Sequence, residues 1–303
     1  MKRTPVHSAA LIRKGEWTMS NDHIAENQAG QGRGVTMAAA VELVTDWAVF
    51  HKRFEVDPSR VACRLAGEIF PFHVPVIDRL RCLDEARRNT ASRILSQKPD
   101  VKLDPTAVDA ERVRRLPLEE AAALPNLHIS LFDLADMVKP GGSLEQLNEE
   151  VLLPMEKLWH AEGMRWEKFW PVIFITGSRS ATNYHADPHA TLPLNLFGRK
   201  RFWGLKDPER WLPGHELDQM QQKGIIWPTK PAKITSDDCV THDNAPGDIV
   251  YIPVRTPHWV DAGSFSATLT FALPGLRVER KTMVTSSWGR PAAIAVGEAR
   301  DVP

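Results

Sequence analysis

Thr182-Asn183-Tyr184-His185-Ala186-Asp187 is the first of two stretches that decide the fold of this chain. The second is Pro246-Gly247-Asp248-Ile249-Val250-Tyr251-Ile252-Pro253, which leads to Pro257 and His258. The first stretch carries an imidazole and a carboxylate with one residue between them. Residues i and i+2 of a strand point to the same side, so His185 and Asp187 can act together at a strand end. We expect His258 to reach the same place from a distant strand that the fold brings alongside.

Two imidazoles and one carboxylate form a ligand set that is typical of non-haem Fe(II) sites. Neutral imidazole suits the intermediate softness of Fe(II), and one carboxylate lowers the net charge of the site. Three ligands on one face leave three positions open, of which a 2-oxo acid can take two and dioxygen the third. The alternative for an isolated His-x-Asp is a surface histidine followed by an aspartate that caps a turn before Pro188.

The surrounding sequence favours the metal site over this alternative. Lys200 follows His185 by fifteen residues, after a turn at Gly198, and Thr182 precedes His185 by three residues. His258 comes shortly after a Gly-Asp-x-x-x-Ile-Pro pattern at residues 247–253. A chance match would not be expected to reproduce all of these features together.

With these motifs, the region from about residue 171 to residue 274 resembles the JmjC-type, cupin-like family of Fe(II)- and 2-oxoglutarate-dependent oxygenases. The family pattern runs Thr-x-x-His-x-Asp, Gly-x-Lys-Arg-aromatic, Gly-Asp-x-x-x-Ile-Pro, His, and then a strand rich in Ser and Thr. These elements stand here at residues 182–187, 198–202, 247–253, 258 and 264–271. The match covers about a third of the chain. It is specific for family and cofactor and silent on substrate.

The resemblance implies three iron ligands, His185, Asp187 and His258. It also implies that Lys200 pairs with the distal carboxylate of 2-oxoglutarate and that Thr182 donates a hydrogen bond to the same carboxylate. The physics agrees, because a dicarboxylate inside a barrel needs a cation and a donor to offset its desolvation. The alternative for Lys200 is a solvated cation beside a turn. Strand alternation argues against it, since Lys200 points inward if Phe202 does.

The chain departs from the family pattern at three places. Many members carry Asn or Gln soon after His-x-Asp, where this chain has residues 189–193 and, further on, Asn195. Many carry an aromatic pair just before the second histidine, where residues 255–257 are Arg-Thr-Pro. The last core strand often has an inward Asn, where this chain has Thr268 and Thr270. We take Asn195 and Thr270 as candidate cofactor-binding residues on the cleft side of their strands.

The composition is that of a globular protein of 303 residues, 43% of them hydrophobic. The 38 basic and 38 acidic residues give a formal charge of zero, so no global field favours nucleic acid or an anionic membrane. No apolar run approaches the roughly 18–20 residues that span a bilayer, and the N-terminus does not resemble a secretory signal. Three widely spaced cysteines favour neither a disulfide framework nor a zinc site. We therefore expect a cytoplasmic protein.

Four regions are expected along the chain, and the first two precede residue 171. Residues 1–36 are polar, end in a glycine-rich stretch and are predicted to be a flexible N-terminal extension. Residues 37–170 are predicted to be largely helical and to pack on a barrel, with short strands near Phe70 and Ile129. Within this region, apolar residues recur near helical spacing in 38–54, 76–95, 113–123 and 144–170.

The pattern changes at Pro171 to short strands punctuated by Gly and Pro, which indicates a barrel or sandwich. The fold class expected is α+β, with a double-stranded β-helix (a jelly-roll or cupin-like barrel) at residues 171–275 and a C-terminal tail at 276–303. A barrel of this kind would bring His185 and His258 to one mouth, as the chemistry requires.

The sequence therefore predicts a dioxygenase that uses Fe(II), 2-oxoglutarate and O2. We expect it to hydroxylate a C–H bond of a small molecule, an amino acid, or a peptide or protein side chain, with release of succinate and carbon dioxide. Two other classes stay open: a metal-dependent cupin enzyme that does not use 2-oxoglutarate, and a non-catalytic barrel with a binding or regulatory role. Lys200 argues against the first, and the intact ligand set argues against the second. The expected partners are the substrate and, in a homodimer, a second copy of the chain.

Overall fold

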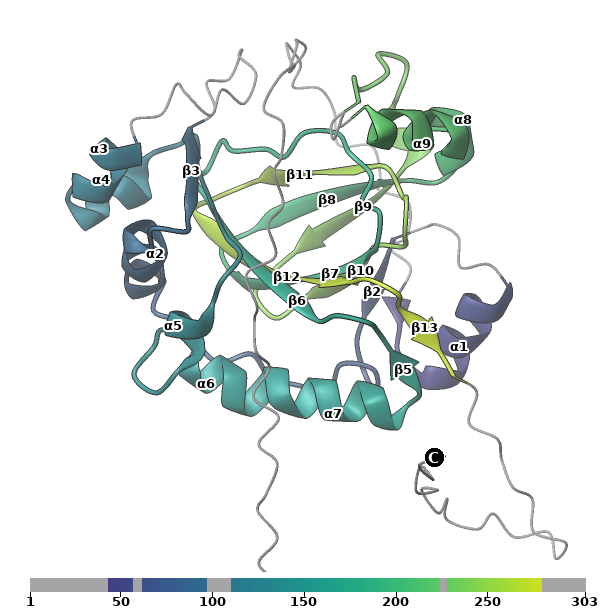
Figure 1. Ribbon diagram of the computed structural model, residues 1–303, viewed down its shortest axis with the longest axis horizontal. Helices are drawn as coiled ribbons and strands as arrows, with labels where there is room; N and C mark the ends of the chain where they lie inside the picture. The colour runs from purple at the N-terminus through teal and green to yellow at the C-terminus, as the bar shows by residue number, and fades with distance from the viewer. Residues whose placement is uncertain (1–42, 57–61, 97–109, 224–227, 280–303) are drawn as a thin grey trace, which may run out of the picture.

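Two β-sheets face each other at the centre of the protein (Figure 1). The computed structural model describes residues 43–56, 62–96, 110–223 and 228–279. The larger sheet has the strand order β1 (Leu43–Val44), β2 (Cys63–Leu65), β10 (Ile249–Tyr251), β7 (Ala190–Phe197), β12 (Ser266–Leu273), β6 (Trp170–Thr176), β4 (Leu127–Leu131) and β3 (Arg93–Ser96). The smaller sheet has the order β11 (His258–Ala262), β8 (Lys200–Leu205) and β9 (Cys239–Asn244). A separate pair joins β5 (Met164–Arg165) to β13 (Arg277–Val278).

The chain passes repeatedly from one sheet to the other. β6 lies in the larger sheet, the segment that contains Ala181 and His185 bridges to β11 of the smaller sheet, and β7 returns to the larger sheet. β8 and β9 then lie in the smaller sheet, β10 in the larger, β11 in the smaller and β12 in the larger. This alternation is consistent with the jelly-roll or cupin-like barrel predicted from Pro171 onward.

The two faces of the larger sheet differ in polarity. One face carries Ile173 and Leu269, which belong to the main hydrophobic core beneath the helices. Alternate positions point the other way, towards the smaller sheet, and include the buried polar residues Thr176, Asn195 and Thr268. The Asn195 amide indeed reaches the backbone of β9. The main apolar core thus lies outside the barrel, and several buried polar side chains lie on the face that is turned towards the smaller sheet.

Helices cover the outer face of the larger sheet (Figure 1). They are α1 (Trp47–Val56), α2 (Arg79–Arg88), α3 (Ala110–Arg115), α4 (Leu118–Ala123), α5 (Ala135–Val138), α6 (Glu145–Leu147) and α7 (Leu153–Ala161), with a π-helical turn at Asn148–Leu152 between the last two. Trp159 of α7 is fully buried, and its indole N–H donates to the carbonyl oxygen of Ile69 at 2.9 Å. Helix α7 is therefore fixed to the body of the protein by both packing and a buried hydrogen bond.

A largely helical N-terminal half is not clearly confirmed, because the same region supplies β1 to β4 to the larger sheet. β4 coincides with the strand expected near Ile129, whereas Phe70 lies in a loop. Such short strands are stabilised by pairing with strands distant in sequence, so local spacing underestimates them. The predicted extension at 1–36 and most of the tail, residues 280–303, lie outside the described residues.

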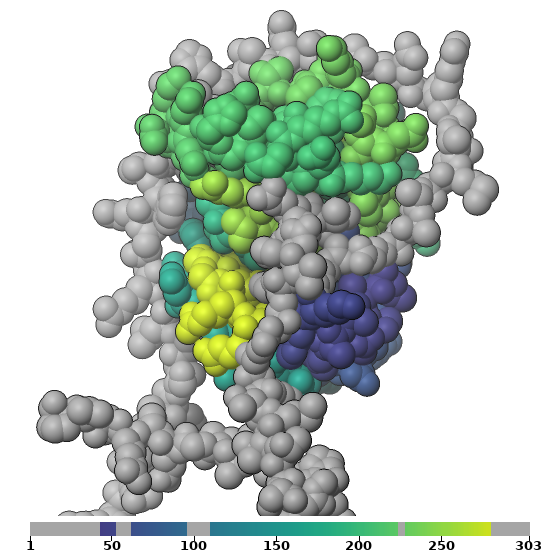
Figure 2. Space-filling model, turned by 90° about the vertical axis from the view of Figure 1, so that its right-hand side faces the viewer, coloured from purple at the N-terminus to yellow at the C-terminus, as the bar shows by residue number. Residues whose placement is uncertain are grey.

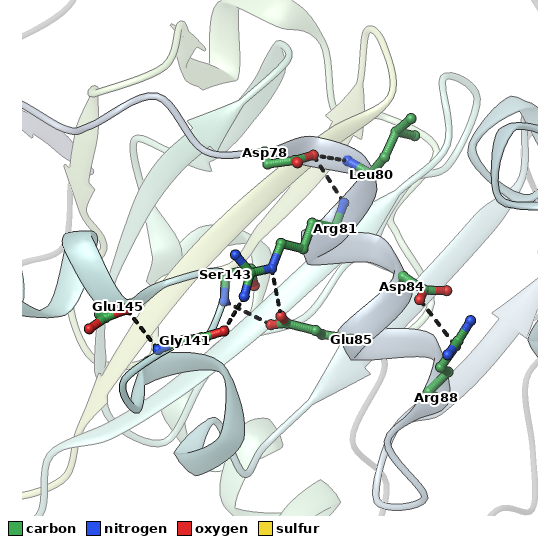
Figure 3. A network of polar contacts seen from close by, with 9 residues as sticks. All are labelled: Asp78, Leu80, Arg81, Asp84, Glu85, Arg88, Gly141, Ser143 and Glu145. Carbon is green, nitrogen blue, oxygen red and sulfur yellow. Dashed lines mark hydrogen bonds and ion pairs between the residues drawn. The ribbon is translucent and has the colours of Figure 1, made fainter.

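A network of polar contacts joins α2 to the loop before α6 (Figure 3). Asp78 caps the helix by accepting hydrogen bonds from the backbone N–H groups of Leu80 and Arg81, each at 3.1 Å. Glu85 accepts from Arg81 Nε at 3.1 Å and from Ser143 N at 2.9 Å. These contacts hold the outer layer of helices together.

The connection between β8 and β9 contains α8 (Pro208–Trp211) and α9 (Gly214–Gln222), followed by a 3-10 turn at Ser236–Asp238. Figure 1 places α8 and α9 on the opposite side of the sheets from α7, and they form part of the green mass at the top of Figure 2. Among the helices in the described parts of the chain, none has the length and apolar character that crossing a membrane requires.

Candidate metal centre

Three potential metal ligands converge beside β11. His185 lies opposite His258 in an antiparallel bridge, and Asp187 follows His185 by two residues. One ligand atom from each of these side chains lies within 4.8 Å of the other two. His185 Nε2 is 3.9 Å from Asp187 Oδ1, and His258 Nε2 is 3.7 Å from Asp187 Oδ2. These separations are too long for direct hydrogen bonds and leave room for a metal ion between the three groups.

Backbone carbonyls orient both imidazoles. His185 Nδ1 is 2.7 Å from the carbonyl oxygen of Asn183, and His258 Nδ1 is 2.8 Å from that of Thr256. Because a carbonyl oxygen can only accept, each Nδ1 carries the proton and each Nε2 presents its lone pair. Hydrogen bonds of this kind fix the tautomer and ring orientation of metal-binding histidines. The two Nε2 atoms and the carboxylate therefore fit a divalent metal such as Fe(II).

His258 is the most deeply buried of the three ligands, with 4% of its surface exposed. Burial, with a smaller contribution from nearby His185, lowers the pKa of His258 to about 4. The ring is therefore neutral at physiological pH, which is the form that binds metal. The Asp187 side chain is 27% exposed, so the carboxylate lies where solvent and small molecules can reach the centre.

The segment that carries the ligands is supported by the connection between β8 and β9. Ala186, between the two ligands His185 and Asp187, is buried against Leu212 and Leu217 of this connection. On the other side of Asp187, its carbonyl oxygen accepts a hydrogen bond from Arg255 N at 2.9 Å.

Arg255 is the one described non-glycine residue with a positive φ, at 61°. Its guanidinium forms an ion pair with Asp218 of α9. A left-handed backbone of this kind costs on the order of 1–3 kcal/mol in a non-glycine residue. Arg255 belongs to a loop that is hydrogen-bonded to Asp187 and ion-paired with α9. We therefore expect α9 to help hold the candidate ligands in place.

Lys200 begins β8 and points into the barrel. It is 5% exposed, as is expected if it shares the inner face with the buried Phe202, whereas Arg201 between them is exposed. Lys200 Nζ donates to the carbonyl oxygen of Phe174 at 3.3 Å. Burial lowers the pKa of Lys200 to about 7, and no carboxylate in the described ranges of the chain offsets that effect. A buried ammonium without a counter-charge is unfavourable unless an anion pairs with it.

Thr182 lies between the ligands and Lys200 along the smaller sheet. Its backbone N–H donates to the carbonyl oxygen of Val260 at 2.8 Å, and its hydroxyl oxygen accepts from Val260 N at 2.8 Å. Val260 stands midway between His258, a candidate metal ligand, and Ala262, the register partner of Lys200. Because the Thr182 hydroxyl accepts this bond through a lone pair, its proton is still able to bind an anion.

Asn195 and Thr270, both predicted to bind a cofactor, have different surroundings. Asn195 is fully buried, and its amide donates to the carbonyl oxygens of Gly198 at 2.9 Å and Asn244 at 3.3 Å. Its donors therefore hold the turn between β7 and β8 to β9. Thr270 is half-buried in β12, with Pro193 as a register partner. For both residues the cofactor contact stays a prediction, and for Asn195 the geometry indicates a structural role.

His128 of β4 is a buried residue that the sequence analysis did not identify. It is 6% exposed, and its ring nitrogens lie 3.2 Å from the Ser130 hydroxyl and 3.5 Å from the Ser180 hydroxyl. Burial, with a smaller contribution from the charge of Lys200, lowers the pKa of His128 to about 4. The signal in the sequence was the alternation of polar and apolar residues at 127–131, which places His128 and Ser130 on the barrel side of β4.

No protein-family model matches the sequence, and no curated protein matches it. Among solved structures, similar ones include YcfD, a ribosomal oxygenase from Escherichia coli, with 16% identity, a TM-score of 0.46, and coverage of 77% of this chain and 53% of that chain. Its complex with cobalt and 2-oxoglutarate matches with 15% identity, a TM-score of 0.45, and coverage of 81% and 55%. A cupin superfamily protein from Desulfitobacterium hafniense matches with 13% identity and a TM-score of 0.23, over 37% of this chain and 75% of its own. The chain thus spans about half the length of the Escherichia coli oxygenase.

Proposed function

We propose that this protein is an Fe(II)- and 2-oxoglutarate-dependent oxygenase of the JmjC-like, cupin-like type. The observation that carries the proposal is the pairing of two features inside one barrel: a His-Asp-His ligand set and a buried lysine without a counter-charge among the described residues. A metal site alone suits many cupin-type enzymes. The buried cation adds a need for an anion, and a dicarboxylate that also chelates the metal meets that need.

The distance between the two features suits a small dicarboxylate. His258 is the register partner of Gly204, and Lys200 lies four residues earlier on the same strand. Four residues of strand correspond to roughly 13 Å between the Cα atoms of Lys200 and Gly204. The lysine stem and a five-carbon dicarboxylate together can fill this interval, with one end at the metal ligands and the other at the ammonium.

The chain's own residues would position the reactants and protect the site. His185, Asp187 and His258 would hold the iron on one face and leave the other face open. Lys200 and Thr182 would bind the distal carboxylate, so that the 2-oxo acid end is directed to the metal. Bound together, iron and 2-oxoglutarate supply the oxidation of a C–H bond by dioxygen, with release of succinate and carbon dioxide.

The neighbouring apolar residues would exclude water from the interior. Ala62, Phe202, Val250 and Ile252 form a small buried cluster, and Val260 packs against it. Phe202 stands on the same face of β8 as Lys200, and Val260 follows the ligand His258 on β11 by two residues. A dry interior strengthens the attraction between Lys200 and a carboxylate. It also favours one defined substrate C–H bond near the metal over random oxidation.

The proposed reaction is hydroxylation, and the proposed substrate is a small molecule, an amino acid, or a peptide or protein side chain. A homodimer in the cytoplasm is proposed as the working form.

The test is an anaerobic titration of the metal-free protein with Fe(II) and then with 2-oxoglutarate, followed by visible absorption. A weak charge-transfer band is expected when the 2-oxo acid chelates the ferrous ion. The Lys200→Met variant should bind Fe(II) as the wild type does but need much more 2-oxoglutarate to develop the band. His215→Ala, which changes an exposed histidine of α9, is the control. Bound iron without a band in the wild type would contradict the 2-oxoglutarate proposal and favour a cupin enzyme that works without it.

A further inference from the structure

Asn244 ends β9 directly opposite Lys200. The two residues are register partners in the antiparallel pair of β8 and β9, so their side chains project from the same face. Asn244 is 1% exposed, like the buried Lys200 and unlike the exposed Asp243 beside it. Asn244 therefore lies on the inner face of the smaller sheet, next to the buried ammonium.

The neighbouring pair on the outer face has a different composition. Arg201 faces Asp243, and two hydrogen bonds of 2.5 and 2.8 Å join their side chains. On the inner face of the same two strands, the cation faces an amide instead of a carboxylate. On the outer face, the Arg201 cation is therefore paired with a carboxylate of the same sheet. On the inner face, the Lys200 cation has no such carboxylate among the described residues and is available to a ligand.

The Asn244 amide has no internal partner among the described residues. Both Nδ2 and Oδ1 are buried without a hydrogen bond. Asn195, which is also buried, donates twice through its own amide, once to the Asn244 carbonyl oxygen. Leaving a buried polar group unpaired is unfavourable, and such groups usually have a ligand or an ordered water as partner. Within the described part of the chain, an amide without a partner beside an ammonium without a counter-charge indicates a shared ligand.

We propose that Asn244 is a specificity-determining residue that donates a hydrogen bond from Nδ2 to the distal carboxylate of the 2-oxo dicarboxylate held at Lys200. The inference rests on the proposed function and adds to it a donor from a strand that the sequence motifs do not cover. The amide oxygen would accept from the Lys200 ammonium and thereby direct that group to the same carboxylate. Together the two residues would select 2-oxo acids that carry a second carboxylate.

The experiment measures ligand binding in place of turnover. Manganese-loaded protein is titrated calorimetrically, without oxygen, with 2-oxoglutarate and with 2-oxobutyrate, which lacks the distal carboxylate. Asn244→Ala is expected to weaken 2-oxoglutarate binding by about 10-fold to 100-fold, as for the loss of one hydrogen bond to a charged group. Binding of 2-oxobutyrate should change little. Thr241→Ala, on the outer face of the same strand, is the control and should leave both affinities unchanged.

Asn244→Asp provides a second and sharper variant. It places a carboxylate opposite Lys200, as Asp243 already stands opposite Arg201. The new internal pair should occupy the ammonium and reduce 2-oxoglutarate affinity by more than about 100-fold, while the manganese affinity and the 2-oxobutyrate affinity stay as in the wild type. Circular dichroism screens every variant for folding. If Asn244→Ala does not fold, Asn244→Ser takes its place in the same comparison.

The outcomes separate this inference from the function on which it rests. If the wild type and Lys200→Met both fail to bind 2-oxoglutarate, the proposed function itself is wrong. A second outcome is that the wild type binds 2-oxoglutarate and Lys200→Met does not. If Asn244→Ala then keeps the wild-type affinity for 2-oxoglutarate and the wild-type preference over 2-oxobutyrate, the proposed role of Asn244 is wrong and the proposed function stands. In that case an ordered water is the partner of the Asn244 amide.

Discussion

His185 and His258 are paired backbone to backbone in an isolated bridge that joins the segment between β6 and β7 to β11. His185 N donates to the carbonyl oxygen of His258 at 3.0 Å, and His258 N donates to that of His185 at 2.8 Å. Their ring centroids are 4.2 Å apart. Two residues that are distant in the sequence are therefore held together by a bridge that needs no metal. The fold itself therefore brings the candidate ligands together, in contrast to sites that fold only around their metal.

Removal of a ligand should abolish metal binding without unfolding the protein. We expect Asp187→Ala to reduce the affinity for Fe(II) by more than about 100-fold, because changes to residues that only orient the ligands already cost about 10-fold to 100-fold. The backbone bridge between the two histidines is untouched, so the circular dichroism spectrum and the unfolding midpoint of the metal-free protein should match the wild type. Equilibrium dialysis against Fe(II) measures the affinity, with His215→Ala as the control. Equal iron binding by Asp187→Ala and the wild type would exclude this centre.

The packing of α9 should influence the ligands from outside the barrel. Leu217 is 3% exposed and packs with Ala186, which stands between two ligands. Leu217→Ala should lower the free energy of unfolding by about 2–5 kcal/mol through the cavity that it leaves. It should also weaken metal binding, though less than the loss of a ligand does. Urea unfolding and dialysis measure the two effects. Leu217→Met, which conserves volume, should leave both near the wild-type values. A destabilised Leu217→Ala protein with full metal affinity would show that α9 does not position the ligands.

Thr182 offers a test of the second anchor. Thr182→Val removes both the acceptor for Val260 N and the donor that we assign to the distal carboxylate. The expected loss of 2-oxoglutarate affinity is about 10-fold, the value of a hydrogen bond worth about 1.5 kcal/mol. Thr182→Ser keeps the hydroxyl and should bind as the wild type does. Calorimetry with the manganese-loaded protein measures both affinities. If serine and valine at this position weaken binding equally, the hydroxyl is not an anchor and the threonine methyl group matters instead.

The candidate metal ligands could be chosen from the sequence because metal chemistry depends on a few residue types in a fixed local pattern, and the structure brings the three side chains together. His185 and Asp187 are two residues apart on a segment that forms only an isolated bridge to β11, whereas Lys200 begins β8 after a glycine turn, so strand alternation orients Lys200. The position of the second histidine depended on the resemblance to a family, since no local rule says which strands will be neighbours.

The other polar residues of the barrel interior depend on pairings that local patterns do not specify. His128 faces the barrel because β4 pairs with β6, and Asn244 faces Lys200 because β8 pairs with β9 in one particular register. A shift of one residue would turn Asn244 outward and Asp243 inward. The strands of the N-terminal half were underestimated for the same reason, since short strands such as β2 are stabilised by partners far along the chain.

The charge state of Lys200 should make 2-oxoglutarate binding depend on pH. Burial lowers the pKa of this lysine to about 7 in the absence of a ligand, so the ammonium is largely charged at pH 6 and largely neutral at pH 8.5. An anion binds the charged form, and binding must therefore be accompanied by proton uptake at higher pH. We expect the affinity to be constant below about pH 6.5 and to fall by up to about 10-fold for each pH unit above 7. The pKa of His128 is about 4, so the neutral ring of this neighbour does not titrate in that range.

Lys200→Arg provides the matched variant for this dependence. Arginine keeps its charge throughout the pH range of the experiment, so its affinity for 2-oxoglutarate, even if weaker at pH 6.5, should stay flat up to pH 8.5. Calorimetry in two buffers that differ in ionisation enthalpy measures the proton uptake, which should approach one proton per ligand at pH 8.5 in the wild type and none in Lys200→Arg. The ligand carboxylates are ionised across the whole range and add no slope of their own. A wild type with flat affinity and no proton uptake would mean that Lys200 is charged before the ligand arrives, which requires a counter-charge or solvent at its ammonium.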